Sequence, residues 1–260
     1  MAYGYSHASW SQAYLEDVSN STFKQIEKMI HSTFDPCRVG RGRDAEDLDH
    51  CDISVNDIQR VKNRKIFREY CDFRDELKEK TCDGDNVEEI EDFPQKVWSF
   101  KKSRRHVDLN EIYLFHGTSE DSANMIINEG FDTGITNPRN LYGRGIYFAE
   151  EFTKADQYTD DRDDRDPHGT ELTLLLCKVL MGNAFMCGKY DAEKWKQPPC
   201  MKCDRSKCRH GWKHRYDSVL GSGHGMLFRE FVVYDGRQVF PEFIIKYERL
   251  GGWEPLHEYE

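Results

Sequence analysis

The first third of the chain carries apolar residues at the three- to four-residue spacing of amphipathic helices in two places. The first stripe consists of Phe23, Ile26, Ile30 and Phe34, and the second of Ile66, Tyr70, Phe73 and Leu77. Thr22 and Gln25 form a capping box at the start of the first helix. Residues 52–61, between the two helices, predict a weak strand.

From residue 110 onward the pattern changes to short apolar runs separated by turn residues. These runs cover residues 112–115, 145–149, 172–181, 231–234 and 243–247, and a helix between the first two ends at Gly130. Helices followed by many short strands predict an α+β fold rather than alternating β-α units. We expect an N-terminal arm over residues 1–20, one domain over 21–250 with inserted loops at about 81–108 and 188–214, and a C-terminal tail over 251–260.

Composition narrows the class of protein. Of the 260 residues, 38% are apolar and 13% aromatic, which favours a globular chain over a disordered one. The net charge of −10 argues against attraction of the whole surface to nucleic acid or an anionic membrane, and leaves only a local basic patch for such contacts. The longest apolar stretch, residues 172–181, is too short to span a bilayer. The nine cysteines, an odd number with no apolar leader after Met1, indicate reduced thiols in an intracellular protein, cytoplasmic or nuclear.

A few residues in this pattern are candidates for chemistry. His116, Gly117 and Thr118 follow a buried strand, Tyr147 lies in a glycine-rich strand, and Glu230 begins a late strand. Taken one at a time, each has a structural interpretation, because a His at a strand end, a core Tyr and a solvated Glu at a strand edge are all common. The sequence contains no glycine-rich phosphate loop, metalloprotease helix or nucleophile elbow.

In their order along the chain, these residues resemble the catalytic domain of the poly(ADP-ribose) polymerases, the diphtheria-toxin-like ADP-ribosyltransferases. The matching stretches are YLFHGTSEDSANMIINEGF, YGRGIYFAEEFTKADQY, YDSVLG and REFVVYDGRQVFPEFIIKY. The last stretch is most similar to the tankyrase branch, through Gln238, Pro241, Glu242, Ile244 and Tyr247. The resemblance covers residues 20–250 approximately and implies two facing antiparallel sheets with flanking helices and an NAD⁺ cleft.

The resemblance also implies a catalytic triad of His116, Tyr147 and Glu230. His116 corresponds to the residue that hydrogen-bonds the ribose hydroxyls of NAD⁺, and Tyr147 to the residue that closes one side of the nicotinamide pocket. Glu230 corresponds to the carboxylate that stabilises the oxocarbenium-like state when nicotinamide leaves as a neutral ring. The same carboxylate orients an incoming ribose hydroxyl, so we expect poly(ADP-ribose) synthesis on a protein acceptor, with the chain itself as one candidate acceptor. Transfer of a single ADP-ribose and an inactive NAD⁺- or ADP-ribose-binding scaffold are the alternatives.

The remaining NAD⁺-binding residues implied by the resemblance are Gly117, Thr118, Ser122 and Tyr158. Gly117 corresponds to the residue whose backbone pairs with the nicotinamide carboxamide, and Tyr158 to the aromatic that stacks on the nicotinamide ring. The chain departs from the family pattern at Ala155, where a Ser usually donates a hydrogen bond to the carboxamide. Loss of one neutral hydrogen bond, about 0.5–1.5 kcal/mol, predicts weaker NAD⁺ binding without loss of catalysis. The family's helical regulatory domain is not recognisable here, so we expect no activation by DNA breaks.

A second group of candidates is Cys200, Cys203, Cys208 and His210, with His214 as the alternative fourth ligand. Three thiols and a His at this spacing predict a tetrahedral zinc site. Free cysteines in a polar loop are the alternative. Tankyrases carry zinc in a different segment, which has no cysteine here. Basic residues in the same loop, namely Lys202, Arg205, Lys207, Arg209, Lys213 and Arg215, leave contact with nucleic acid or acidic peptides as a less favoured interpretation.

Overall fold

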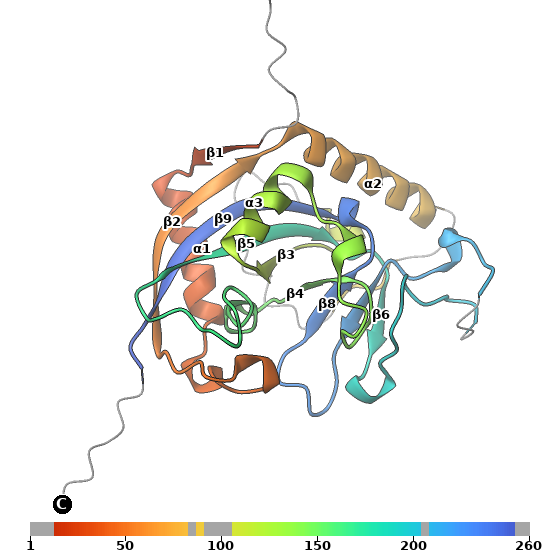
Figure 1. Cartoon of the computed structure of the whole chain (residues 1–260). Helices are drawn as coiled ribbons and strands as arrows, with labels where there is room; N and C mark the ends of the chain where they lie inside the picture. The colour runs from red at the N-terminus through yellow and green to blue at the C-terminus, as the bar shows by residue number, and fades with distance from the viewer. Residues whose placement is uncertain (1–12, 83–86, 91–105, 204–207, 253–260) are drawn as a thin grey trace, which may run out of the picture.

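Two sheets form the centre of the fold (Figure 1). The computed structural model describes residues 13–82, 87–90, 106–203 and 208–252. The larger sheet has the order β1 (Tyr14–Asp17), β2 (Asp52–Lys62), β9 (Val239–Leu250), β5 (Glu171–Leu180) and β3 (Glu111–Gly117). The smaller sheet has the order β4 (Ile146–Phe148), β8 (Glu230–Val233), β7 (Ser218–Gly221) and β6 (Ala184–Cys187). The predicted α+β class with two packed sheets is confirmed, with the difference that β6 and β7 run parallel.

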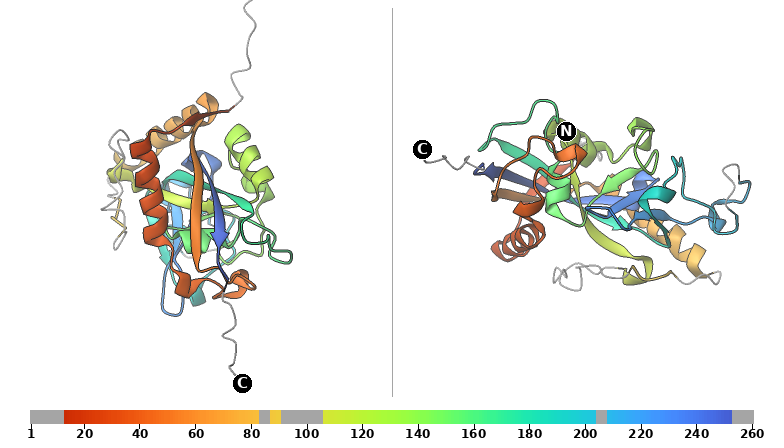
Figure 2. Two further views of the ribbon diagram at one scale, coloured as in Figure 1. Left: turned by 90° about the vertical axis from the view of Figure 1, so that its left-hand side faces the viewer. Right: turned by 90° about the horizontal axis from the view of Figure 1, so that it is seen from below.

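The helices cover both faces of the larger sheet, and Figure 2 shows α1 and α3 on opposite sides of it. On one face, α1 (Asn20–Thr33) and α4 (Phe152–Asp156) bury apolar side chains against β2, β3, β5 and β9. On the other face, α3 (Glu120–Glu129) and the smaller sheet share a second core with the same strands. The remaining helix, α2 (Arg64–Cys82), packs its apolar stripe against β5, β9 and the segment before β3. The larger sheet is therefore buried on both sides.

Short 3₁₀ turns connect these elements. They are Pro36–Arg38, Arg43–Ala45, Val107–Leu109, Thr133–Ile135, Lys189–Asp191, Trp212–His214 and Gly236–Gln238. The first two lie in the loop between α1 and β2, which we call the 35–50 loop. The turns at 189–191 and 212–214 lie in the predicted inserted loop over 188–214, between β6 and β7.

Some element limits in the structure differ from those expected from the sequence. The N-cap of α1 is Ser19 rather than Thr22, because the Ser19 hydroxyl accepts a hydrogen bond from the Thr22 amide at 3.3 Å. Residues 14–17 of the predicted arm form β1 and pair with β2. The second helix extends to Cys82, into the predicted inserted loop over 81–108. The rest of that loop over 83–86 and 91–105, the arm over 1–12 and the tail over 253–260 lie outside the described residues.

The two sheets are joined at one point that matters for the site. Phe115 in β3 and Ala149 after β4 exchange backbone hydrogen bonds of 2.8 and 2.9 Å. This bridge brings the end of β3, with His116, beside β4, with Tyr147. The turn at Asp235 and Gly236 then carries the chain from β8 in the smaller sheet to β9 in the larger one.

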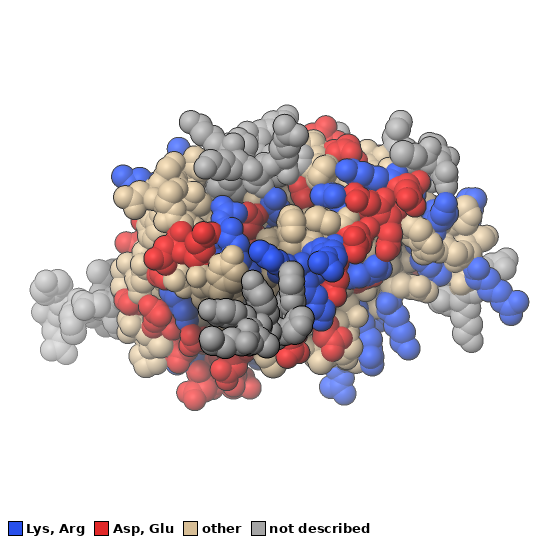
Figure 3. All heavy atoms as spheres, turned by 90° about the horizontal axis from the view of Figure 1, so that it is seen from above, with Lys and Arg blue, Asp and Glu red and all other residues tan. Residues whose placement is uncertain are grey.

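Charge is distributed without one dominant sign on the face shown in Figure 3, where Lys and Arg are interspersed with Asp and Glu. Among the described residues, no helix combines the length and the apolar character that crossing a membrane requires.

Candidate active site

His116 lies at the end of β3 among aromatic side chains. Its ring is in edge contact with Phe131 at 4.9 Å and tilted against Phe148 at 5.3 Å between centroids. The Nδ1 atom is 2.9 Å from the carbonyl oxygen of Tyr147, so Nδ1 carries the hydrogen and donates it. Burial lowers the pKa of His116 to about 4, against the opposing effect of this hydrogen bond. At neutral pH the imidazole is therefore uncharged, and its Nε2 is left as a hydrogen-bond acceptor.

Tyr147 and Glu230 lie on one face of the smaller sheet. Tyr147 is paired with Val232, and Glu230 precedes Val232 by two residues, so the strand alternation places all three on the same side. The Tyr147 hydroxyl donates to the Gly143 carbonyl at 3.1 Å and accepts from the Tyr142 amide at 2.9 Å. Burial, and to a lesser extent the Glu230 charge, raises the pKa of Tyr147, which keeps the phenol neutral. The hydroxyl thus fixes the chain just before β4.

The position of Glu230 is set by an ion pair of its neighbour Arg229, called the clamp below, and by the nearby Lys154 ammonium. Arg229 and Glu150 form a two-pronged ion pair with both N···O distances at 2.6 Å, which fixes the start of β8 against the end of β4. The Lys154 ammonium lies 3.7 Å from the Glu230 carboxylate. Burial raises the pKa of the Glu230 carboxyl, the Lys154 charge opposes that rise, and the Asp44 charge adds to it.

Gly117 is required by close packing of the backbone. A Cβ atom added there would lie 1.8 Å from the Ala155 carbonyl oxygen and 3.2 Å from the Tyr158 Cβ. Ala155 itself is buried in the core against the larger sheet, so an apolar contact lies where the resemblance implies a hydroxyl. Gly117 therefore lets α4 approach β3, in addition to the role that the resemblance implies for its backbone.

Tyr158 is 41% exposed, but its ring is not free of neighbours. The Lys154 ammonium lies 4.7 Å from the ring centroid and also contacts the hydroxyl. The hydroxyl donates to the Asp44 carboxylate at 3.0 Å. The 35–50 loop, through Asp44, thus reaches the aromatic side chain that was predicted to stack on nicotinamide.

Thr118 and Ser122 are near His116 along the chain, and Ser122 has a local partner. Thr118 connects β3 to α3, whose N-cap is Ser119. Ser122 lies in the first turn of α3, where its hydroxyl oxygen is 3.0 Å from the Ser119 hydroxyl. Their predicted part in NAD⁺ binding stays a prediction.

Sequence reasoning missed Asp44, Lys154 and the Arg229–Glu150 clamp. Lys154 falls inside a stretch that matched the family and lies in α4, four residues before Tyr158, so its position carried a usable signal. Glu150 and Arg229 also fall inside matching stretches, but nothing in the sequence pairs them, and Asp44 lies outside every matching stretch. Their contacts join segments that are remote in the chain.

The predicted metal ligands are brought together elsewhere in the fold. Cys200, Cys203, Cys208 and His210 converge in the loop between β6 and β7, and their ligand atoms all lie within 4.8 Å of one another. His214 contacts the His210 ring edge-on at 5.9 Å between centroids and is not part of this group. Of the basic residues in the loop, Arg205 and Lys207 lie outside the described residues.

Comparison with known proteins identifies the family. The family described as poly(ADP-ribose) polymerase catalytic domain matches residues 21–249. The human protein mono-ADP-ribosyltransferase PARP12 is 30% identical over 141 residues, which is 54% of this chain and 17% of that protein. The mouse protein mono-ADP-ribosyltransferase PARP11 is 28% identical over 177 residues, which is 62% of this chain and 50% of that protein.

The human PARP11 is likewise 28% identical over 177 residues, or 48% of its length. The chain thus spans half or less of the length of these relatives. The family match covers nearly all of the described residues, from α1 to the last residues of β9. The chain belongs to the poly(ADP-ribose) polymerase catalytic domain family.

Proposed function

We propose that this chain transfers ADP-ribose from NAD⁺ to a protein acceptor and releases nicotinamide, adding a single unit at each acceptor site. The observation that carries the proposal is the grouping of His116, Tyr147 and Glu230 at the junction of the two sheets. The Nδ1–H of His116 donates to the Tyr147 carbonyl at 2.9 Å, which leaves Nε2 free to accept a hydrogen bond from a ribose hydroxyl. Glu230 lies on the same sheet face as Tyr147 and supplies a carboxylate.

These residues suit cleavage of the bond between nicotinamide and ribose. The electron pair of that bond stays with the nicotinamide nitrogen, so the ring leaves neutral and needs no general acid. Positive charge develops at the ribose carbon, where the Glu230 carboxylate stabilises it. An acceptor atom then bonds to that carbon and gives up its proton to the surrounding water. Gly117 and Tyr158 supply the backbone and ring contacts for nicotinamide, with Thr118 and Ser122 beside them.

Two observations favour transfer of single units over polymer synthesis. PARP11 and PARP12, the relatives described above, are named as mono-ADP-ribosyltransferases. In addition, Lys154 lies 3.7 Å from the Glu230 carboxylate and 3.9 Å from the carboxylate of Asp44. Polymer growth needs a second ribose hydroxyl to reach Glu230, and Lys154 lies against the same carboxylate. The likeness to the tankyrase branch stays a prediction.

Polymer synthesis remains the second candidate, because Glu230 is the residue type that can orient a ribose hydroxyl as acceptor. Incubation of the purified chain with NAD⁺ labelled in the adenylate phosphate, followed by denaturing gel electrophoresis, separates the candidates. We expect discrete labelled bands, on the chain itself or on added acceptor proteins. A ladder would establish polymer synthesis instead, and no label under any condition would support the inactive scaffold.

Several further proposals follow from the sequence and are not carried by the geometry. They are an intracellular location in cytoplasm or nucleus, independence from DNA breaks, and self-modification. The less favoured nucleic-acid contact through the basic loop would appear as labelling stimulated by added nucleic acid.

The surroundings of Glu230 predict a pH dependence. Catalysis needs the ionised carboxylate, so kcat/KM should fall in acid around a pKa above that of an ordinary Glu. Lys154→Met removes the charge that lowers this pKa and is expected to move the acid limb to higher pH. Asp44→Asn removes a charge that raises it and is expected to move the limb to lower pH. Burial lowers the pKa of His116 to about 4 and neither Lys154 nor Asp44 contributes to that shift, so both variants leave the contribution of His116 in place. Shifts in the same direction, or none, would contradict this assignment.

A further inference from the structure

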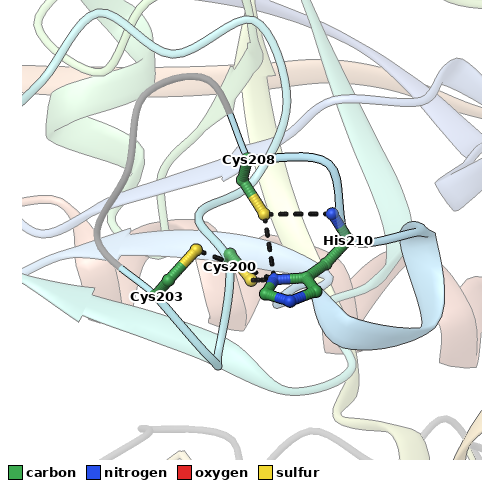
Figure 4. Close-up of side chains that lie close together, drawn as sticks. All are labelled: Cys200, Cys203, Cys208 and His210. Atoms are coloured by element: carbon green, nitrogen blue, oxygen red, sulfur yellow. Dashed lines mark hydrogen bonds between the residues drawn. The ribbon is translucent and has the colours of Figure 1, made fainter.

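The loop between β6 and β7 gathers four soft ligands at one point (Figure 4). Cys200, Cys203, Cys208 and His210 come from a stretch of eleven residues, and the figure shows the three sulfurs facing the imidazole. The eight cysteines for which the structure describes a side chain are all free thiols. The cluster is therefore a set of unpaired ligands rather than a disulfide.

The distances match a shared metal better than hydrogen bonding. His210 Nδ1 lies 3.3 Å from the Cys200 sulfur, 3.7 Å from Cys203 and 3.2 Å from Cys208. A neutral imidazole nitrogen carries at most one hydrogen, so it cannot donate to three sulfurs. In a tetrahedral zinc site with Zn–S near 2.3 Å and Zn–N near 2.0–2.1 Å, each sulfur is about 3.6 Å from the nitrogen. All three contacts lie near that separation.

Backbone amides point at two of the sulfurs. The Lys202 amide donates to Cys200 at 3.4 Å, and the His210 amide donates to Cys208 at 3.3 Å. Such donors stabilise thiolates, the form in which cysteine binds metal. Three thiolates and one imidazole select zinc over calcium or magnesium, and four protein ligands close the coordination sphere.

We propose that Cys200, Cys203, Cys208 and His210 bind one structural Zn²⁺, and that this ion holds residues 195–200 against the chain that positions Tyr147. The 195–200 segment runs from the metal cluster to the Gly143–Tyr147 region. The metal site stands apart from the proposed function, whereas its effect on NAD⁺ binding rests on that function.

At the metal end, the 195–200 segment is fixed by the chain that follows the metal ligands, at Arg215 and Tyr216. Cys200 forms a backbone bridge with Arg215, and the Tyr216 amide donates to the Pro199 carbonyl at 3.0 Å. The Arg215 guanidinium donates to the carbonyls of Pro198 at 3.0 Å and Cys208 at 3.4 Å. These contacts tie both halves of the metal-binding loop to the same segment.

At the other end, the segment touches the wall of the candidate active site. The Trp195 carbonyl accepts from the Arg144 amide at 2.8 Å, and the Trp195 ring is parallel to Tyr142 at 6.4 Å between centroids. Gly143 has φ +81°, and a Cβ there would fall 2.1 Å from the Trp195 carbonyl oxygen. The Tyr147 hydroxyl bonds to this same Gly143 carbonyl and Tyr142 amide. A shift of Trp195 is therefore transmitted to Tyr147 through backbone contacts.

Metal content and binding of a nicotinamide mimic test the two parts separately. The full chain, purified without chelator, is expected to hold about one zinc per molecule by elemental analysis. Cys200→Ser and His210→Ala should lose the zinc. His210→Cys should keep it, because four ligands remain. Cys37→Ser changes an exposed cysteine outside the cluster and is the matched control. Cobalt added to the zinc-free protein should give a tetrahedral, thiolate-bound spectrum that changes in His210→Cys.

For the coupling, we expect affinity for benzamide to fall about fivefold or more in Cys200→Ser and His210→Ala, and to be retained in His210→Cys and Cys37→Ser. Zinc-free wild-type protein that binds no added zinc or cobalt would overturn the site, as would a disulfide among these cysteines. Zinc loss with unchanged benzamide affinity would overturn the link to Tyr147. Absence of benzamide binding in every form, with zinc present, would instead contradict the proposed function.

Discussion

Replacement of Glu230 by Gln is expected to slow ADP-ribosyl transfer by about a hundredfold or more while leaving affinity for benzamide nearly unchanged. Gln has the shape of Glu but no charge, so it loses the stabilisation of the developing positive ribose carbon. The nicotinamide contacts are assigned to Gly117 and Tyr158, so the ground-state complex should persist. The measurement is single-turnover transfer from labelled NAD⁺, together with calorimetric titration of benzamide.

The stability of this variant separates chemistry from folding. Burial raises the pKa of the Glu230 carboxyl, which means that its ionised form is disfavoured in the folded protein. A neutral amide removes that cost, so the Tm of Glu230→Gln should equal or exceed that of the parent. Glu79→Gln, at an exposed position on α2, is the control and should change neither rate nor Tm. Full activity of Glu230→Gln would show that the carboxylate has no part in the reaction.

Gly117→Ala is expected to damage both the fold of the site and ligand binding. The new Cβ would lie 1.8 Å from the Ala155 carbonyl oxygen, which belongs to backbone and cannot rotate away. The segment with Ala155 and Tyr158 must therefore move away from β3. Overpacking of this kind costs about 1–3 kcal/mol, and in a domain of this size each kcal/mol lowers Tm by about 2–4 °C. Because Tyr158 moves with the segment, benzamide affinity should fall by about tenfold or more.

A matched glycine provides the control for that prediction. Gly211 has φ −66°, and a Cβ there would meet nothing within 4 Å. Gly211→Ala should therefore keep the parent Tm and benzamide affinity. If Gly117→Ala behaved like Gly211→Ala, the packing of α4 on β3 would not determine the pocket. A fall in Tm with unchanged benzamide affinity would place the ligand away from Gly117 and Tyr158.

The elements that bury apolar residues could be predicted from the sequence. Ile26 and Ile30 in α1, and Tyr70 and Leu77 in α2, are buried as their spacing indicates, because burial of one face drives both pattern and structure. Strand β1 gave no such signal, since all four of its residues are exposed and it forms only by pairing with β2. The parallel pairing of β6 and β7 was likewise hidden, because it depends on the long loop between them.

The candidate site likewise has a part that the sequence could predict and a part that it could not. Residues in continuous motifs, such as His116 and Tyr147, could be proposed by resemblance, and the structure places them in hydrogen-bond contact. Asp44 reaches Tyr158 from a loop more than a hundred residues earlier in the chain, and Arg229 meets Glu150 across two strands. Contacts of this kind are set by tertiary packing, and no local pattern encodes them.

The most direct measurement of the central claim compares nicotinamide released with ADP-ribose bound covalently to protein, using NAD⁺ labelled in one part or the other. The account predicts that the purified chain releases one nicotinamide for each ADP-ribose attached, and that both signals fall together in Glu230→Gln. Nicotinamide release with no covalent label would show hydrolysis of NAD⁺ in place of transfer. Absence of both signals in the parent chain, under conditions where benzamide binds, would contradict the claim that this site is a transferase.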